Sequence, residues 1–455
     1  MSVVEPPVVA IVPGPESEEI GRCAVRKASW RLIPLIALGY GAAYMDRVNI
    51  SFASLRMNRD LHFSATVYGF GAGLFFLSYA ACEVPSNLLL VRFGARRWLA
   101  RIMFTWGLLA IAMMFVKTAP QFYVVRFLLG MAEAGFFPGV VFYLMQWFPP
   151  ETRARAISGF YVSLPLSSVV MGGVAGALLN LQGRFGLRGW QWLFLVEGLP
   201  AVVLSFVFLA RLADTPADAK WLRPAERAWL TERIRVDSES GGHTHDVVRA
   251  LRDPRVLQIG LVFLCMLAAS YAYTFSAPAI IQKLTGWSTT NVGFFIAGTG
   301  LLAAASMILN ARHSDRRGER YWHVIAPFLI IGCGFTVGGL SIWPWLAVPA
   351  LTATVVCYSA LLGPLLAVPP MFLKGKTMAA GIAAMNTLGM LGGFIGPYWM
   401  GLAKDLTGNY QRGMLTLTIP SLIAAGIMFR MMIQAKRPDG RFEHSPSRSG
   451  QPSGL

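Results

Sequence analysis

Charged residues are scarce in this chain. Asp, Glu, Lys and Arg make up 14% of its 455 residues, whereas hydrophobic residues make up 55% and the mean hydropathy is +0.52. A soluble enzyme would carry more charge and would lack recurring apolar runs of helix length. The shortage of charge therefore excludes an ordinary soluble protein and predicts a polytopic membrane protein.

Acidic residues are scarcer than basic ones. The chain has 23 Asp and Glu against 40 Lys and Arg, a formal net charge of +17. Such a balance would indicate a nucleic-acid partner if the basic residues formed one patch. They fall mainly between apolar segments instead, as the positive-inside rule for membrane proteins predicts. We therefore expect a lipid bilayer around the chain and no nucleic-acid partner.

Cysteine is rare and scattered. The five cysteines are far apart and four lie in apolar segments, so neither a disulfide framework nor a metal site is indicated. His243 and His245 are close in sequence, but without a cysteine or carboxylate cluster we interpret them as solvated loop residues. No Ser-His-Asp, metal or cofactor motif stands in a suitable setting. We predict no catalytic residue, no cofactor, no metal and no enzymatic activity.

Long apolar runs are what the chain does have. A transmembrane helix needs about 20 such residues. A first set of runs lies near 31–54, 66–90, 98–116, 121–147, 155–180 and 190–211. A second set lies near 255–281, 289–310, 322–342, 345–369, 378–403 and 413–434. We predict an all-α membrane protein with twelve transmembrane helices in two pseudo-symmetric six-helix halves, residues 30–211 and 255–434.

The remaining segments are hydrophilic. Residues 212–254 predict a cytoplasmic connector, in which Gly241 and Gly242 indicate a flexible tether. Residues 1–29 and 435–455 are predicted to be cytoplasmic tails, because an even number of spans places both termini on the Arg-rich side. The N-terminal segment lacks the basic region and cleavage site of a secretory signal, so we expect the first helix to be an uncleaved anchor in the inner membrane.

Two short motifs recur at nearly the same offset and support the division into halves. Arg92-x-Gly94-x-Arg96-x-Trp98 returns as Arg316-x-Gly318-x-Arg320-x-Trp322, and Gly172-Gly173-x-x-Gly176 returns as Gly392-Gly393-x-x-Gly396. The glycine motifs lie inside apolar runs, where glycine permits close approach of two backbones. We interpret them as packing and sliding surfaces.

Arg47 and Asp46 lie in the middle of the first apolar run. A charge there costs about 2.5 to 3.5 kcal/mol on insertion, so such residues are usually functional. Tyr44 and Arg47 share a helix face, whereas Asp46 points about 100° away and needs a different partner. A guanidinium is planar, permanently charged and suited to a carboxylate. We therefore predict that Arg47, with Tyr44 beside it, binds an organic anion.

Arg126 and Glu133 lie seven residues apart in the fourth run, about 10 Å along a helix, and share one inward face. Arg126 is a second candidate for the substrate carboxylate. The alternative for this pair is an interhelical ion pair of structural importance. Carboxyl groups in an apolar, partly dry site can take up a proton near neutral pH. Asp46 and Glu133 are accordingly the predicted proton-coupling residues.

Other polar residues of the spans are candidates for gating or for substrate contact. Glu83 lies nearer the cytoplasmic end of the second run, beside the Arg92 loop, which favours a gating ion pair over substrate contact. Tyr79, one turn earlier, is a candidate to contact substrate, with aromatic packing as the alternative. The second half offers hydroxyl and amide groups and no charge deep within a span. We expect the first half to hold the carboxylate and the proton, and the second to read the rest of the solute.

These motifs carry a family resemblance. Residues 311–320 (ARHSDRRGER) resemble the loop signature of the major facilitator superfamily, which implies gating roles for Asp315, Arg316, Gly318 and Arg320 and for their counterparts Arg92, Gly94 and Arg96. The segments around Asp46, Glu83 and Arg126 resemble the anion:cation symporter family, which includes tartrate, phthalate and galactonate permeases. The resemblance implies that Tyr271 and Asn386 lie near the central cavity.

We predict a monomeric transporter that imports a small organic anion together with protons. The chain departs from the family pattern at two places: Met390 stands where many relatives carry an Asn, and Leu164-Pro165-Leu166 stands where a sugar-acid relative would be expected to offer an amide side chain. Compared with such relatives the chain offers fewer polar partners, which implies that tartrate or an aromatic acid such as phthalate fits better than a highly hydroxylated hexonate. The alternatives within transport are an anion exchanger and a Na⁺-coupled carrier. A sensor that binds an organic acid without moving it is a further alternative, although the short connector and tails contain no recognisable signalling domain.

Overall fold

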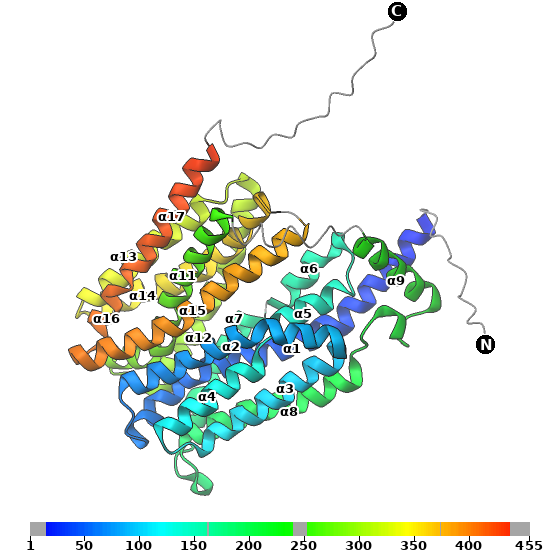
Figure 1. Ribbon diagram of the computed structural model, residues 1–455. Helices are drawn as coiled ribbons and strands as arrows, with labels where there is room; N and C mark the ends of the chain where they lie inside the picture. The colour runs from blue at the N-terminus through cyan, green and yellow to red at the C-terminus, as the bar shows by residue number, and fades with distance from the viewer. Residues whose placement is uncertain (1–14, 162, 240–252, 374, 437–455) are drawn as a thin grey trace, which may run out of the picture.

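The computed structural model describes residues 15–161, 163–239, 253–373 and 375–436, and all their regular secondary structure is helical (Figure 1). Ten helical segments of this described chain are long and apolar enough to cross a membrane. The predicted all-α membrane fold is therefore confirmed. Gly241, Gly242, His243 and His245 lie outside the described residues.

The first half contains a long helix followed by shorter ones. They are α1 (Pro15–Asp60), α2 (Ala65–Phe93), α3 (Ala95–Ala112), η1 (Met113–Phe115), α4 (Ala119–Glu133), α5 (Phe136–Met145), α6 (Pro150–Tyr161), α7 (Ser163–Leu179), η2 (Arg184–Gly186) and α8 (Gly189–Arg211). The connector contributes η3 (Pro216–Asp218) and α9 (Pro224–Glu239). The second half contains α11 (Pro254–Thr285), α12 (Thr289–Arg317), α13 (Trp322–Leu340), α14 (Pro344–Leu366), η4 (Pro369–Met371), α15 (Gly375–Thr407), α16 (Tyr410–Thr416) and α17 (Thr418–Lys436).

The fourth apolar run is interrupted where one continuous span was predicted. Gly135 has a φ of +87°, which only glycine adopts readily, and it separates α4 from α5. A Cβ at this position would lie 2.4 Å from the Ser86 Oγ of α2, so the site also has no room for a side chain. The break places Glu133 at the last turn of α4. Sequence periodicity alone does not reveal such a kink, because both flanking segments are apolar.

The predicted N-terminal tail is partly helical. α1 is 46 residues long and begins at Pro15, well before the predicted span. Its early turns pack against the connector: the Lys27 Nζ donates hydrogen bonds of 2.7 and 2.9 Å to the Glu226 carboxylate of α9. The Arg31 guanidinium lies 5.3 Å from the centre of the Trp221 ring, and Gly21 abuts the Trp229 ring. Residues 15–29 and α9 therefore form one structural unit with the first half.

The two halves meet mainly along two helix pairs, and α1 also contacts α11. α2 packs on α15, where Gly69 and Gly73 approach the backbone carbonyls of Pro397 and Phe394, and α7 packs on α12. A Cβ at Gly172 would lie 2.3 Å from the Gly293 oxygen, whereas nothing lies within 4 Å of one at Gly173. In Figure 1 the α2–α15 contact reaches the end of the bundle farthest from α9, which we call the far end.

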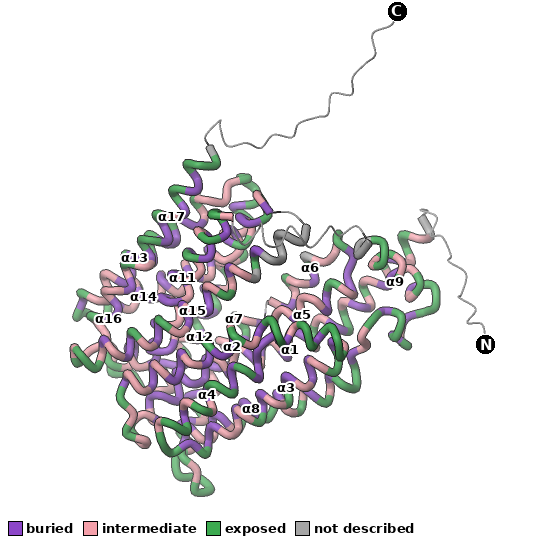
Figure 2. Tube along the Cα trace, in the orientation of Figure 1, coloured by how far each residue is buried: buried purple, intermediate pink, exposed green. Residues whose placement is uncertain are grey.

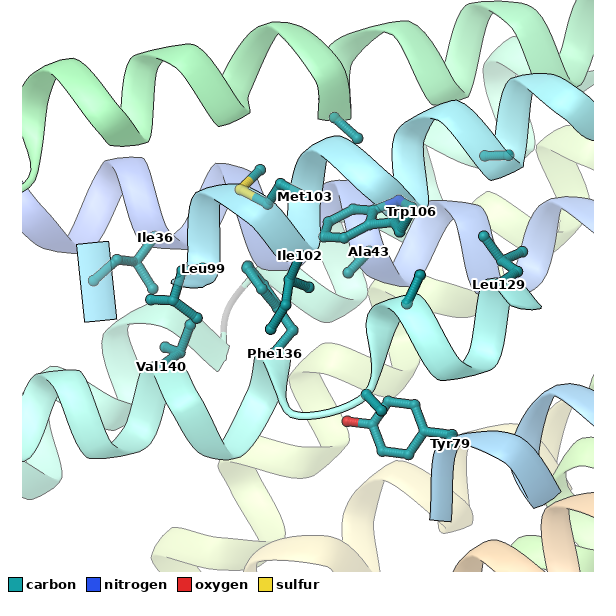
Figure 3. Close-up of a cluster of buried hydrophobic side chains, with 14 of the residues drawn as sticks. Ile36, Ala43, Tyr79, Leu99, Ile102, Met103, Trp106, Leu129, Phe136 and Val140 are labelled. Carbon is teal, nitrogen blue, oxygen red and sulfur yellow. The ribbon is translucent and has the colours of Figure 1, made fainter. Parts of the chain in front are cut away.

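Each half has its own cluster of buried apolar side chains. One cluster of buried apolar side chains joins the helices of the first half and includes Phe275 and Met390 of the second, and another cluster joins α11 to α17. In Figure 3 the side chains of Leu99, Ile102 and Trp106 on α3 face Phe136 and Val140 of α5. Buried positions lie mainly where helices face one another, and exposed ones mainly on the outer faces (Figure 2). Many outer residues are large and apolar, as expected for surfaces that contact lipid.

Candidate functional site: a cavity between the halves

A cavity of about 340 Å³ lies between the two halves. Its wall is formed by α1, α7 and the end of α6 on one side and by α11, α12 and α14 on the other. The polar or aromatic lining residues are Tyr40, Tyr44, Arg47, Ser51, Phe52, Tyr161, Ser168, Ser270, Tyr271, Tyr273, Thr274, Phe295, Thr299, Thr352, Tyr358 and Ser359. Pockets of this kind, mostly apolar with a few polar groups, are typical ligand sites.

Arg47 is the single charged side chain that lines this cavity in the described part of the chain. Its guanidinium forms an ion pair and hydrogen bond with the Glu133 carboxylate of α4. The same group lies 5.5 Å from the centre of the Phe75 ring and 5.4 Å from that of Tyr79. Arg47 is thus held in place by α2 and α4, while part of its surface faces the cavity.

Arg126 lies behind this wall and not on it. Its side chain is 1% exposed, and its Nη2 donates a hydrogen bond of 3.3 Å to the Ala72 carbonyl. Its guanidinium lies 5.0 Å from the centre of the Phe75 ring. The Phe75 ring is therefore in contact with both arginines. In this conformation Arg126 cannot meet a solute in the cavity without a rearrangement of α2.

Asp46 is also buried, 2% exposed, and takes a different partner from Arg47. Its Oδ1 accepts a hydrogen bond of 3.4 Å from the Asn49 Nδ2, and its Oδ2 has no hydrogen-bond partner. The charges of Glu133, Arg126 and Arg47 all act on it. The two predicted proton-coupling residues therefore lie in one electrostatic cluster with the two arginines.

The residues predicted to contact substrate are divided by the structure. Tyr44, Arg47 and Tyr271 line the cavity, and the Tyr271 ring lies 4.3 Å from that of Phe76. Tyr79 is 2% exposed and does not line the cavity, but its ring packs against the Arg47 guanidinium. Asn386 lies between the halves instead of on the cavity wall. Sequence reasoning missed Tyr40, Tyr161 and Ser168, because neutral residues in an apolar run give no signal of a functional position.

Glu83 pairs with an amide where a cation was expected. The Asn386 Nδ2 of α15 donates hydrogen bonds of 3.1 and 3.2 Å to the two oxygens of the Glu83 carboxylate. This contact joins the first half to the second.

The repeated loop motifs lie at helix ends, and the first of them contacts the connector at Asp214. The Arg96 backbone N–H donates a hydrogen bond of 2.8 Å to Asp214, and its Nε donates one of 2.7 Å to the Leu209 carbonyl. Gly94 has a φ of +85°, and Arg92 lies over the Phe93 ring. In the second half Asp315 pairs with Arg320, Gly318 ends α12 with a φ of +63°, and Arg316 is exposed.

The sequence of the chain matches the family model described as "Major Facilitator Superfamily" over residues 36–397. The chain belongs to this superfamily. Its members' fold of twelve helices in two halves accounts for the architecture, and this facilitator is a transporter and not an enzyme. The predicted membership and the predicted absence of enzymatic activity are confirmed.

Individual comparisons agree with this assignment. A protein of Agrobacterium vitis named "Putative tartrate transporter" is 45% identical over 404 residues, which cover 88% of this chain and 89% of the relative. A quinolone resistance transporter of Acinetobacter baumannii is 37% identical, covering 90% of this chain and 95% of the relative. The solved structure of a bacterial homologue of the human lysosomal transporter Spinster, inward-facing and unoccupied, has a TM-score of 0.75 at 15% identity, covering 92% of this chain and 97% of that one.

Proposed function

We propose that this facilitator imports a small organic anion, such as tartrate or phthalate, together with protons across the inner membrane. The observation that supports the proposal is the position of Arg47, whose guanidinium faces the cavity while it is paired with Glu133. A solute carboxylate and the Glu133 carboxylate would compete for the same planar donor group. Binding of the solute therefore favours the form of Glu133 that carries a proton and no longer needs the arginine.

This competition couples the import of the anion to the import of protons. With the cavity open to the outside, Asp46 and Glu133 take up protons, and the solute carboxylate pairs with Arg47. The charges in the cluster are then balanced, so the halves can rock about the central site in alternating access. When the cavity opens to the cytoplasm, the carboxyl groups lose their protons and Glu133 regains Arg47, which releases the solute.

The remaining lining of the cavity suits a compact carboxylic acid as the substrate. Tyr44 and Tyr271 flank the cavity from opposite halves, and hydroxyl groups such as those of Thr274 and Ser359 lie on the second half. Aromatic faces suit a planar ring, whereas hydroxyl groups suit the polar atoms of tartrate. The high identity to a protein named for tartrate makes this acid the first to test.

Proteoliposomes with an imposed pH gradient test the proposal. The wild type should concentrate a radiolabelled anion in response to the gradient, and replacing sodium or the internal counter-anion should have no effect. Glu133→Gln and Asp46→Asn mimic a permanently protonated carrier, so they should bind and exchange the anion without concentrating it. Glu232→Gln, a change of the same chemistry on the connector helix α9, should behave as the wild type.

Three outcomes would contradict the proposal. Accumulation that follows a sodium or counter-anion gradient instead of pH would indicate a Na⁺-coupled carrier or an exchanger. If both variants, separately and combined, still concentrated the anion, the two carboxyl groups would be structural partners of the arginines, and Glu83 would be the next candidate. Binding without any uptake would support the sensor alternative.

A further inference from the structure

Glu197 is a buried carboxyl group that the transport cycle above does not use. It lies in the middle of α8, is 4% exposed, and neither of its oxygens has a hydrogen-bond partner. The groups that act on it are the Asn49 side chain and the Asp46 carboxylate, both on α1. The neighbouring contacts of α8 with α3 and α7 involve Gly107, Ile111 and Leu179, which carry no titratable group.

The charges of this region do not balance if every carboxyl group is ionised. The buried cluster contains the carboxyl groups of Asp46, Glu133 and Glu197, and a fourth buried carboxyl group, Glu83, also interacts with Arg47. Against them, the described residues of the cluster supply two guanidinium groups, those of Arg47 and Arg126. Glu133 is paired with Arg47, and Asp46 lies in the field of both arginines. Glu197 is the member without a cation among its interacting groups. An ionised carboxylate buried without a partner is very costly, so the cluster needs at least one bound proton.

Asn49 shows where that proton belongs. Its Nδ2 donates to Asp46, whereas its Oδ1 is buried without a partner. An amide oxygen accepts hydrogen bonds, and a carboxyl group can supply one only when it is protonated. A proton on Glu197 therefore satisfies both groups at once. If the amide is turned over, its nitrogen faces Glu197 and its oxygen requires a protonated Asp46.

We propose that Glu197 is a further proton-binding residue, joined to Asp46 through the Asn49 amide so that the two carboxyl groups share one proton. In either orientation the amide donates to an ionised carboxylate and accepts from a neutral one. Loss of the shared proton leaves two negative charges near each other. Gain of a second proton replaces the charged acceptor of the Asn49 N–H with a neutral carbonyl oxygen, which accepts a weaker hydrogen bond. Glu197 is thus a positioning residue that sets the proton affinity of Asp46, and this role rests on the proposed proton coupling.

Infrared spectroscopy of the purified protein tests the shared proton without any transport. At neutral pH the wild type should show the C=O stretch of a neutral, buried carboxylic acid, and Glu197→Gln should remove or displace this band. Asn49→Ala, which deletes the bridging amide, should shift the band because the carboxyl group loses its acceptor. Glu232→Gln should leave the band unchanged. An unaltered band in both Glu197→Gln and Asn49→Ala would overturn the proposal.

The pH dependence of uptake tests the link to Asp46. In Glu197→Gln the doubly charged pair can no longer form, so Asp46 releases its proton more easily. The alkaline limit of uptake should therefore move to lower pH by about one unit, a tenfold change in proton affinity. The same pH profile as the wild type would make Glu197 a structural acid and overturn the coupling. Failure to transport any organic anion, with the infrared changes intact, would instead refute the proposed function and leave the shared proton standing.

Discussion

At the scale of single residues, the two adjacent charged residues of α1 have different partners. Arg47 reaches Glu133 on α4 and two rings on α2, while Asp46, its neighbour in sequence, uses Asn49 and faces α8. The side chains of these two adjacent residues therefore lie in different environments. The separation lets one turn of α1 present a guanidinium group to the cavity and a carboxyl group to the interior of the first half.

Arg47→Lys is the most direct test of the anion-binding role. The change keeps the charge but replaces a planar, forked donor with a point charge. We expect at least a tenfold loss of uptake efficiency, which corresponds to about 1.4 kcal/mol. Uptake at saturating and subsaturating anion would be measured at matched expression.

Arg188→Lys provides the matched control, because Arg188 pairs with Asp60 at the far end and does not line the cavity. It should transport as the wild type. Normal uptake by Arg47→Lys would reduce Arg47 to a structural charge.

At the scale of elements, glycine positions determine how closely helices from different halves approach. Gly172 of α7 is in contact with the backbone of Gly293 on α12, and Gly393 of α15 lies against the Phe76 ring of α2. Gly392 and Gly396 instead allow α15 to pack on α11 within the second half. The repeated motif thus serves contacts within a half as well as between halves.

Gly172→Ala and Gly173→Ala form a matched pair. A methyl group at Gly172 would lie 2.3 Å from a backbone oxygen, so overpacking should disfavour the present conformation by about 1 to 3 kcal/mol. We expect a clear loss of transport rate and a lower Tm in Gly172→Ala. Gly173→Ala, with nothing within 4 Å, should resemble the wild type. Equal behaviour of the two variants would show that the close contact is unimportant.

The connector helix gives a pH-dependent prediction outside the membrane. Burial alone would raise the pKa of Glu226, but hydrogen bonds from the Lys27 side chain and the Arg223 backbone outweigh it, and the pKa lies below its ordinary value. The pair therefore stabilises the α1–α9 contact at neutral pH, and the stabilisation is lost as pH falls below about 4. Hydrogen exchange of α9, corrected for the intrinsic rate, should show loss of protection over this range.

Glu226→Gln should weaken the protection of α9 already at neutral pH and remove its dependence on acid. Glu232→Gln on the same helix serves as the control, since Glu232 pairs with Arg235 of α9 itself and not with α1. If the two variants exchanged alike, the Lys27 contact would not hold α9 in place.

The sequence predicted the helices and their approximate bounds because a lipid environment imposes long apolar runs. It also indicated Asp46, Arg47, Arg126 and Glu133, since a charge in such a run is conspicuous. It did not reveal the break at Gly135 or the depth of Arg126 behind the cavity wall, both of which depend on how α2 packs. Sequence reasoning missed Glu197, although it is a charge in the sixth run as conspicuous as Asp46, and its burial with two unpartnered oxygens is what the structure adds.

At the scale of the whole molecule, the described structure is closed at its far end by a bond between the halves. The Asp405 carboxylate at the end of α15 accepts hydrogen bonds of 3.1 and 2.7 Å from the backbone N–H groups of Ala65 and Thr66. These groups open α2, where helical N–H donors have no partner within the helix and a negative charge is favourable. A residue of one half thus caps a helix of the other.

Asp405→Ala should destabilise this closed arrangement. Hydrogen bonds to a charged group contribute about 1.5 to 3 kcal/mol each, so the ratio of conformations should change at least tenfold. Spin labels at His62 and Leu406, both exposed, would report a larger fraction of long distances.

Asp60→Ala is the matched control, because Asp60 accepts a hydrogen bond from Trp190 inside the first half. It should leave the distance distribution between the labels unchanged. An unchanged distribution in Asp405→Ala would mean that the glycine contacts alone keep this end closed.

The length of α1 has a mechanical consequence. At 1.5 Å per residue its 46 residues extend about 69 Å, more than twice the roughly 30 Å of the hydrocarbon core. The helix carries Arg47 at the cavity and, several turns away, Gly21 and Lys27 against α9. When the first half rotates about the cavity, the early turns of α1 therefore move farther than the cavity wall does. A protein that bound the segment formed by the early turns of α1 and α9 would therefore restrain the rotation of the first half from outside the membrane.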